Sequence, residues 1–374
     1  MITRSKVEQL RKAIKKGKAI ILTGARQTGK TSLLRMLFPP NEENVLSLIG
    51  DNLDVQKLFE SLTAERLQAY LGKKNVLIID EAQRIPDIGL RLKLITDQLP
   101  NVQLIATGSS SFELANKVNE PLTGRKREFH LYPLSFSEMV DHHGLLTEKR
   151  LLPHRLVFGS YPEVVTHGGD EKDILREISD SYLYKDILSW EQIQKPEKLT
   201  RLLQALALQV GSQVSYSELA RLCGLDSKTV EKYLTVLEQT YIVFRLSSFS
   251  RNARNELKNS RKIYFYDNGI RNAILANFSL IETRSDAGNL WENYVVSERK
   301  KYLDARNRWV NSFFWRTKEQ NEIDLIEESD GTLSAFECKY SAGKLPRVPG
   351  LFRSTYPDAV FTVITPENVE EFLL

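Results

Sequence analysis

The sequence predicts an α/β protein in which a parallel sheet covered by helices is followed by helical segments and a second α/β domain. Three observations lead to this prediction. Apolar runs alternate with helical patterns up to about residue 150, a glycine-bounded loop follows the first of these runs, and carboxylates interrupt apolar strands after residue 285. Because 374 residues can bury two or three cores, these patterns are assigned to separate domains.

The first domain, residues 1–150, contains the alternating pattern. Strands are expected near 19–23, 44–48, 75–79, 102–106 and 128–132, with helical stretches between them. Such alternation is typical of a parallel sheet with helices on both faces.

The loop after the first strand fits the pattern G-x-x-x-x-G-K-[ST] and leads into a helix-forming stretch. In that context backbone N–H groups and a helix N-terminus cradle phosphate. Lys30 is expected to reach the β- and γ-phosphates, and the Thr31 hydroxyl to ligate Mg²⁺. The predicted nucleotide-binding residues are Gly24, Ala25, Arg26, Gln27, Thr28, Gly29, Lys30, Thr31, Ser32 and Asp80.

The strand at 75–79 ends in Asp80 and Glu81, about fifty residues after the loop. Acids at the carboxyl ends of parallel strands lie where such sheets bind ligands. We expect Asp80 to hold Mg²⁺ through water and Glu81 to polarise the attacking water. This half is therefore predicted to be an ATPase or a GTPase. Adenine is favoured because no N-K-x-D guanine-reading motif is present.

Two further features surround this expected site. Thr107 and Ser109 follow the strand at 102–106, where they could sense the γ-phosphate or cap the next helix. Arg125 stands in a basic cluster before the strand at 128–132. It is a candidate arginine finger, acting on its own chain or on a neighbouring subunit, and the alternative is a solvated surface cluster.

Residues 151–210 read as a helical lid or connector, and residues 211–284 as a winged helix-turn-helix. Ser215 and Glu218 form a capping-box pattern, Gly224 provides the turn, and Asp226 can cap a second helix carrying Lys228 and Lys232. A basic hairpin follows, with Arg251, Arg254, Lys258, Arg261 and Lys262. The segment could contact DNA phosphates or serve as a lid or protein-contact module.

Residues 285–374 carry acids in strongly apolar strands. Asp324, Glu337 and Lys339 match the D…E-x-K core of the restriction-endonuclease-like fold, and Glu292 on the preceding helix is a further acidic ligand. There the acids hold Mg²⁺ and the lysine steadies the nucleophile or the phosphate. The alternative is an internal salt bridge between Lys339 and Asp324 or Glu337, which equally satisfies buried charge.

Composition excludes some classes of protein. Fifty-two basic and 48 acidic residues give a net charge of +4, and this small charge does not by itself indicate binding to nucleic acid. The two cysteines match no metal-ligand spacing, and we see neither a signal peptide nor a membrane span. A cytoplasmic protein without membrane contact is expected.

Taken together, the motifs resemble a family of predicted bacterial and archaeal AAA-type ATPases with a C-terminal domain of unknown function. The resemblance covers nearly the whole chain; Asn321 departs from it, standing where members often have glycine. It rests on these segments: 24–31, 77–83, 107–111, 122–125, 131–136, 159–163, 264–269, 322–324 and 337–339.

The resemblance implies an ATPase core of the AAA/STAND-like kind, a winged helix and a nuclease-like tail. The leading expectation is an ATPase whose nucleotide state controls that tail on DNA or RNA. The alternative is a signalling or scaffold switch with a catalytically silent tail that binds nucleic acid or protein. A homo-oligomer would follow if Arg125 acts between subunits.

Overall fold

The computed structural model describes residues 2–14, 17–39, 42–109, 118, 120–181, 195–250, 260–317, 319–341, 343 and 346–374. These residues form two compact units. One comprises residues 3–132 with 239–241, and the other comprises 133–238 with 242–374. The sequence placed the first boundary near residue 150, whereas the first unit ends directly after its last strand.

The first unit is a five-stranded parallel sheet with the strand order β2-β3-β4-β1-β5. Its strands are β1 (Ala19–Thr23), β2 (Val45–Ile49), β3 (Val76–Asp80), β4 (Gln103–Gly108) and β5 (Lys126–His130). All five predicted strands are therefore present, and the α/β prediction is confirmed. The central strands β1, β3 and β4 are almost continuously buried, as expected of a sheet covered on both faces.

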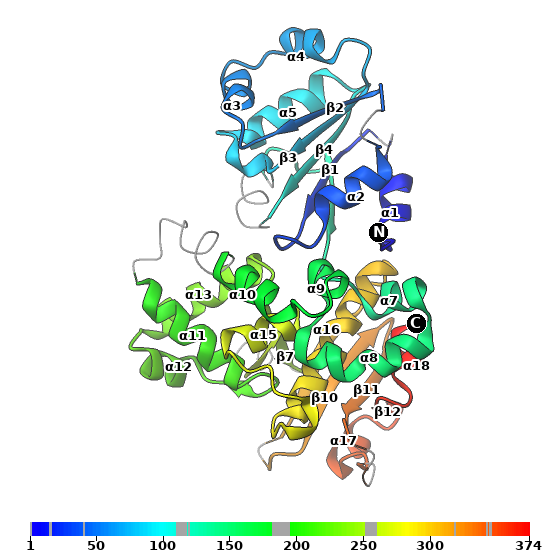
Figure 1. Cartoon of the computed structure of the whole chain (residues 1–374). Helices are drawn as coiled ribbons and strands as arrows, with labels where there is room; N and C mark the ends of the chain where they lie inside the picture. The colour runs from blue at the N-terminus through cyan, green and yellow to red at the C-terminus, as the bar shows by residue number, and fades with distance from the viewer. Residues whose placement is uncertain are drawn as a thin grey trace. The chain divides into compact units, whose positions relative to one another are not determined.

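Helices pack on both faces of this sheet (Figure 1). On one face, apolar side chains of β1, β3 and β4 meet α3 (Leu53–Glu60), α4 (Ala64–Leu71) and α5 (Ile88–Gln98). On the other face they meet α1 (Lys6–Ala13) and α2 (Lys30–Leu37). Because alternate side chains of each strand point to opposite faces, one run of apolar residues serves both cores.

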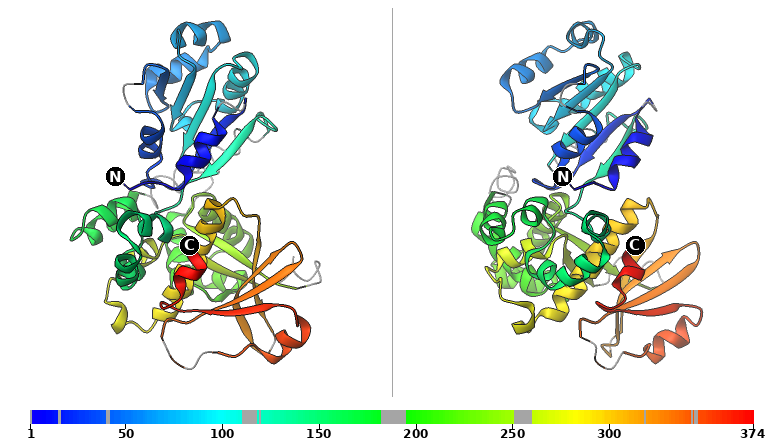
Figure 2. Two further views of the ribbon diagram at one scale, coloured as in Figure 1. Left: turned by 90° about the vertical axis from the view of Figure 1, so that its right-hand side faces the viewer. Right: turned by 45° about the vertical axis from the view of Figure 1, so that its right-hand side comes forward.

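The second unit contains a seven-stranded sheet with the order β12-β11-β10-β9-β7-β8-β6. Figure 2 shows the orange strands β9 and β10 beside the redder β11 and β12. The strands are β6 (Gln213–Val214), β7 (Val243–Ser248), β8 (Arg261–Phe265), β9 (Asn311–Arg316), β10 (Glu322–Ser329), β11 (Thr332–Cys338) and β12 (Val360–Ile364).

This sheet joins two segments that the sequence separates at residue 284. Strand β7, from the predicted winged-helix segment, pairs in parallel with β9 through Ser247–Phe313 and Ser248–Phe314. The hairpin β7–β8 and the strands β9 to β12 thus belong to one sheet and one compact unit. The sequence cannot reveal this because the pairing is set by contacts between residues far apart in the chain.

Helices make up the rest of this unit. They are α7 (Phe136–His143), α8 (Leu145–Phe158), α9 (Pro162–Thr166), α10 (Glu171–Ser181), α11 (Pro196–Leu208), α12 (Tyr216–Cys223), α13 (Ser227–Gln239), α15 (Asn268–Ile274), α16 (Ala287–Ala305), α17 (Gly350–Thr355) and α18 (Val369–Leu373). None of the helices in the described ranges is both long and apolar enough to span a bilayer.

Two helices, α12 and α13, are present in the segment predicted to be a helix-turn-helix. Gly224 ends α12 in the left-handed conformation, with φ 63° and ψ 40°. The Asp226 carboxylate accepts a hydrogen bond from the Thr229 backbone N–H at 2.9 Å, so it caps α13 as expected. Lys228 and Lys232 are exposed on α13. Three of the predicted basic hairpin residues, Arg251, Arg254 and Lys258, lie outside the described residues.

Candidate functional site

The glycine-bounded loop lies at the carboxyl end of β1 and runs directly into α2. Gly29 has φ 92° and Gln27 has φ 57°, so the loop turns through the left-handed region twice before α2 begins at Lys30. A Cβ atom on Gly24 would lie 2.2 Å from the Leu131 carbonyl oxygen, beyond the end of β5. Glycine is therefore required at position 24 by close backbone approach.

Two side chains, those of Thr28 and Lys30, make three hydrogen bonds inside the loop. The Thr28 hydroxyl donates to the Ala25 carbonyl at 2.8 Å, and the Lys30 ammonium donates to the Gly24 and Ala25 carbonyls at 2.8 Å each. Ala25, Thr28 and Lys30 are buried, whereas Arg26 and Ser32 are more accessible. The predicted loop residues thus form one folded loop, with the Lys30 amine inside it.

Arg4 supports this loop and was not singled out from the sequence. Its guanidinium donates to the Thr28 carbonyl and to the Tyr132 carbonyl, each at 2.6 Å. It thereby ties the loop to the chain that follows β5. No motif marks an arginine twenty-four residues before its partner, so sequence reasoning had no signal for it.

Asp80 brings the loop and the neighbouring strands together. Its Oδ2 accepts the Thr31 hydroxyl at 2.9 Å, and its Oδ1 accepts the hydroxyl of Thr107 from β4. Thr107 Oγ1 also accepts the Glu81 backbone N–H at 3.2 Å. The structure therefore places Thr31, Asp80, Glu81 and Thr107 at one edge of the sheet.

Glu81 occupies an uncommon backbone conformation, with φ 51° and ψ 43°. Its Oε2 accepts the Gln83 side-chain amide at 2.6 Å, and the same amide lies 3.3 Å from Ser109 Oγ. Non-glycine residues in the left-handed region carry backbone strain and often belong to functional sites. Gln83, which the sequence reading did not assign, thus connects Glu81 with Ser109.

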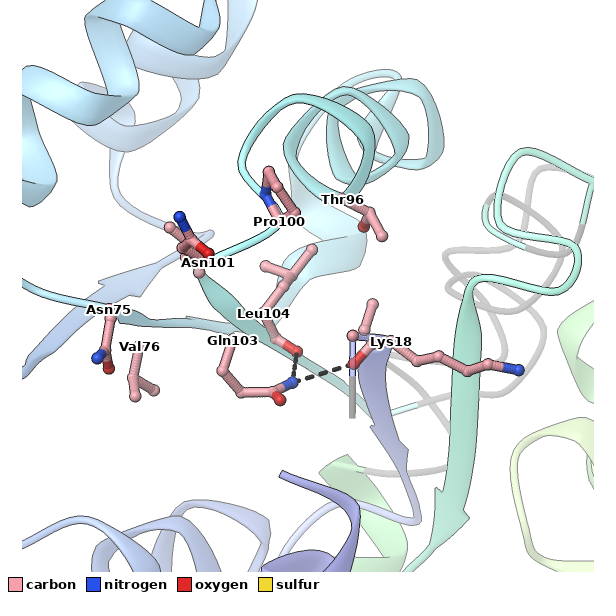
Figure 3. Close-up of a pocket in the computed structure, with 11 residues that line it drawn as sticks. Lys18, Asn75, Val76, Thr96, Pro100, Asn101, Gln103 and Leu104 are labelled. Atoms are coloured by element: carbon pink, nitrogen blue, oxygen red, sulfur yellow. Dashed lines mark hydrogen bonds between the residues drawn. The ribbon is translucent and has the colours of Figure 1, made fainter. Parts of the chain in front are cut away.

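Two pockets border the sheet of this unit. One, of about 290 Å³, includes Thr31 and Asp80 among its lining residues. The other, of about 360 Å³, is lined by Lys18, Asn75, Thr96, Asn101 and Gln103 at the amino-terminal ends of the strands (Figure 3). Only the first contains residues expected to bind nucleotide.

Arg125 lies at the amino-terminal ends of β1 and β5. It directly precedes β5, and its backbone carbonyl accepts the N–H of Ala19, the first residue of β1, at 2.9 Å. Its side chain pairs with Asp97 at 2.6 Å. Because β1 and β5 are parallel and the loop follows the far end of β1, Arg125 and the loop of the same chain lie at opposite ends of β1.

The acids of the second unit surround a lysine. Lys262 on β8 lies 2.9 Å from Glu292 Oε1 and 3.6 Å from Asp324 Oδ1, and it also pairs with Glu322. Tyr264 donates its hydroxyl to Glu292 at 2.7 Å. Lys262, one of the basic residues predicted in the hairpin, has a side chain that is only 1% exposed. Alternate residues of a strand share a face, so Lys262 and Tyr264 are expected on the same face of β8. This alternation was the sequence signal that could have placed Lys262 beside Tyr264.

Lys339, the lysine predicted for this site, pairs with Glu337. Lys339 lies 2.9 Å from Glu337, as the salt-bridge alternative anticipated, and the backbone N–H of Cys338 donates to Asp324 Oδ2 at 2.9 Å. Burial, followed by the charge of Asp324, raises the pKa of Glu292 to about 7 and that of Glu337 to about 6. In the parts of the chain that the structure describes, no three acidic, histidine or cysteine side chains are placed to hold a metal ion.

Magnesium therefore fits the two predicted sites differently. In the first unit, the Thr31 hydroxyl and the Asp80 carboxylate supply hard oxygen donors of the kind Mg²⁺ prefers. In the second, the oxygens of Glu292 and Asp324 face an ammonium group and backbone or hydroxyl donors. The predicted metal set of Glu292, Asp324 and Glu337 does not fit a divalent ion in this arrangement.

Family models match three parts of the chain. Residues 16–140 match an AAA domain, residues 149–280 a domain of unknown function (DUF8612), and residues 287–370 a second domain of unknown function (DUF4143).

Two relatives extend along most of the chain. An uncharacterized protein of Mycobacterium tuberculosis is 27% identical over 359 residues, covering 95% of this chain and 77% of that protein. An uncharacterized protein of Methanocaldococcus jannaschii is 24% identical over 390 residues, covering 94% of this chain and 85% of its own length.

Solved structures give weaker likenesses. A signal transduction ATPase with numerous domains from Pyrococcus horikoshii aligns with 82% of this chain, 13% identity and a TM-score of 0.31, and the chain spans 47% of its length. A second likeness is to a Pif1 helicase from Bacteroides in complex with ADP-AlF3 and single-stranded DNA. The alignment covers 52% of this chain and 58% of the helicase chain, with 15% identity and a TM-score of 0.26. The chain thus combines a segment similar to an AAA domain, at 16–140, with a C-terminal segment similar to a domain of unknown function, at 287–370.

Proposed function

We propose that the first unit binds and hydrolyses MgATP and that its nucleotide state acts as a switch for the second unit. The observation that supports this most is Asp80, whose two carboxylate oxygens accept the hydroxyls of Thr31 and Thr107. One acid thus connects the phosphate-binding loop with the strand expected to sense the γ-phosphate. The match of residues 16–140 to an AAA domain adds independent support for nucleotide binding.

In this proposal Lys30 exchanges partners when ATP binds. Its ammonium leaves the Gly24 and Ala25 carbonyls and pairs with the β- and γ-phosphates, which compensate its charge better than neutral carbonyls do. Thr31 and Asp80 would hold Mg²⁺, which neutralises phosphate charge when bound.

Glu81 is the proposed general base. Its carboxylate is held by the Gln83 amide at 2.6 Å, and it must turn from that amide to meet an attacking water. Thr107 holds the Glu81 backbone and Asp80 in one arrangement. Gln83, Ser109 and Thr107 are therefore proposed as positioning residues that respond to the γ-phosphate.

The test compares Glu81→Gln and Lys30→Ala with the wild-type chain. We expect Glu81→Gln to keep the ATP dissociation constant within a few fold while hydrolysis falls by about 10² or more. Lys30→Ala should lose tight ATP binding. Normal turnover by Glu81→Gln would remove Glu81 from the catalytic role, and unchanged nucleotide affinity in Lys30→Ala would refute the loop assignment.

For the second unit, the ion cluster around Lys262 favours a tail that binds over a tail that cleaves. DNA or RNA remains the proposed class of partner, with Lys228 and Lys232 exposed on α13 of the helix-turn-helix. Binding of single- and double-stranded DNA and RNA should be compared for Glu81→Gln with ATP and with ADP. A nucleotide-dependent difference would support the switch, and Mg²⁺-dependent cleavage lost in Glu337→Ala would favour an ATP-controlled nuclease instead.

A further inference from the structure

The acidic cluster of the second unit carries its own counter-ion. We propose that the Lys262 ammonium occupies the place a divalent metal would need among Glu292, Glu322 and Asp324, so that the tail holds an internal ion cluster in place of a metal site. The inference concerns the second unit alone and does not depend on ATP hydrolysis.

The geometry places the amine within the cluster and away from solvent. Its distances to Glu292 and Asp324 are 2.9 and 3.6 Å, it pairs also with Glu322, and the lysine side chain is 1% exposed. The amine further lies 5.6 Å from the centre of the Phe314 ring. An ammonium removed from water in this way is stable only with close carboxylate partners.

Three elements bring these groups together. Lys262 comes from β8, Glu292 from α16, and Glu322 and Asp324 from β10. Strands β8 and β10 are not neighbours in the sheet, yet Glu322 and Asp324 reach Lys262 directly from β10, and α16 packs against β8 and supplies Glu292. Period two places Lys262 with Tyr264 on one face of β8, and both bind Glu292 Oε1.

One carboxylate oxygen of each of the three acids predicted to bind metal already has a close partner. Glu292 Oε1 accepts Lys262 and Tyr264, Asp324 Oδ2 accepts the Cys338 N–H, and Glu337 pairs with Lys339. A divalent ion needs several oxygens at about 2.0 to 2.6 Å, and an ammonium at the same point repels it. Metal entry therefore requires Lys262 to leave a set of three carboxylates.

The test is a count of Mn²⁺ sites in the nucleotide-free, full-length protein, from the electron paramagnetic resonance signal of unbound Mn²⁺. Mn²⁺ prefers the same oxygen ligands as Mg²⁺. We expect Lys262→Met to bind one Mn²⁺ per chain more than the wild type, and to lose it when Asp324→Asn is added. Lys228→Met, which removes an exposed lysine of the same unit, should match the wild type. Any Mn²⁺ bound by Thr31 and Asp80 is present in the wild type and in every variant, so it does not change the difference in the number of sites.

A wild-type chain that already binds Mn²⁺ at a site abolished by Asp324→Asn would overturn the proposal. So would a folded Lys262→Met protein with no additional site. A second measurement needs no variant: amine acylation of the wild type followed by mass spectrometry. Lys262 should stay unmodified with and without saturating Mn²⁺, whereas labelling that rises with Mn²⁺ would mean that the metal displaces the lysine and would also overturn it.

Discussion

At the scale of single residues, short side-chain contacts join groups from neighbouring strands. Asp80 ends β3, Thr107 belongs to β4, and Thr31 lies in the first turn of α2, yet all three meet through one carboxylate. The Thr107 hydroxyl also accepts the Glu81 N–H. Loss of the Thr107 hydroxyl should therefore disturb the position of Glu81, the expected general base, while the groups that contact the loop at 24–31 stay in place.

The first prediction concerns this hydroxyl. Thr107→Val should leave the ATP dissociation constant within about threefold and lower the hydrolysis rate about tenfold, the effect of one hydrogen bond of roughly 1 to 1.5 kcal/mol. Thr96→Val is the control, since its hydroxyl donates only to the Leu92 carbonyl within α5. Equal hydrolysis rates in the two variants would exclude a positioning role for Thr107.

The second residue prediction concerns Asp286, which precedes α16 and pairs with Arg284 and Arg271. Arg284 first, then Arg271, lowers its pKa to about 2 against the opposing effect of burial. A carboxyl group whose pKa is lower in the folded state stabilises the fold at pH values above its pKa in the unfolded chain, which is about 4. That stabilisation is lost as the pH falls toward 2. Asp286→Asn should therefore cost about 2 kcal/mol at pH 7.

Urea unfolding of the second unit at pH 7, 5, 4 and 3 measures this effect. The difference between wild type and Asp286→Asn should be constant from pH 7 to 5 and shrink below pH 4. A difference that stays the same at pH 3 would show that the loss comes from packing and not from the charge of Asp286.

At the scale of elements, β2 and β3 end against each other beside the expected base. The Gly50 N–H donates to the Asp80 carbonyl at 2.8 Å, directly after β2. A Cβ atom on Gly50 would lie 2.4 Å from the Glu81 carbonyl oxygen. Backbone cannot yield as a flexible side chain does, so any larger residue at position 50 displaces the segment that carries Glu81.

Gly50→Ala is the prediction at this scale. It should destabilise the first unit by about 1 to 3 kcal/mol and lower hydrolysis more than ATP binding, because the loop at 24–31 is not touched. Gly288→Ala in α16 is the matched control, since nothing lies within 4 Å of its added Cβ. Thermal unfolding and steady-state kinetics measure both effects, and unchanged kinetics in Gly50→Ala would mean that Glu81 is free to move.

At the scale of the whole molecule, the parallel topology of the first unit separates Arg125 from the loop. The two lie at opposite ends of β1, about five residues of strand apart, which is roughly 16 Å. If Arg125 stabilises a transition state, it must therefore act on a neighbouring copy of the chain. A homo-oligomer therefore stays a prediction, and the position of Arg125 at the end of β1 opposite the loop suggests how to test it.

Mixing two inactive variants tests it. Arg125→Ala keeps its own ATP site and lacks the arginine, while Lys30→Ala lacks the ATP site and supplies the arginine. We expect the mixture to hydrolyse ATP at least tenfold faster than either variant alone, since an arginine finger contributes about 10³ or more. No recovery, or full activity of Arg125→Ala by itself, would assign Arg125 to the surface and its pair with Asp97.

The sequence by itself determined the parallel sheet, the glycine-bounded loop after β1 and the acids at the end of β3. Each depends on local signals: apolar runs, glycines in a fixed pattern, and residues next to a strand end. The same holds for the caps at Gly224 and Asp226. The tertiary structure decided which distant residues meet, namely Arg4 with the loop, β7 with β9, and Lys262 with Glu292 and Asp324. These contacts depend on how strands and helices pack, and no spacing along the chain encodes that packing.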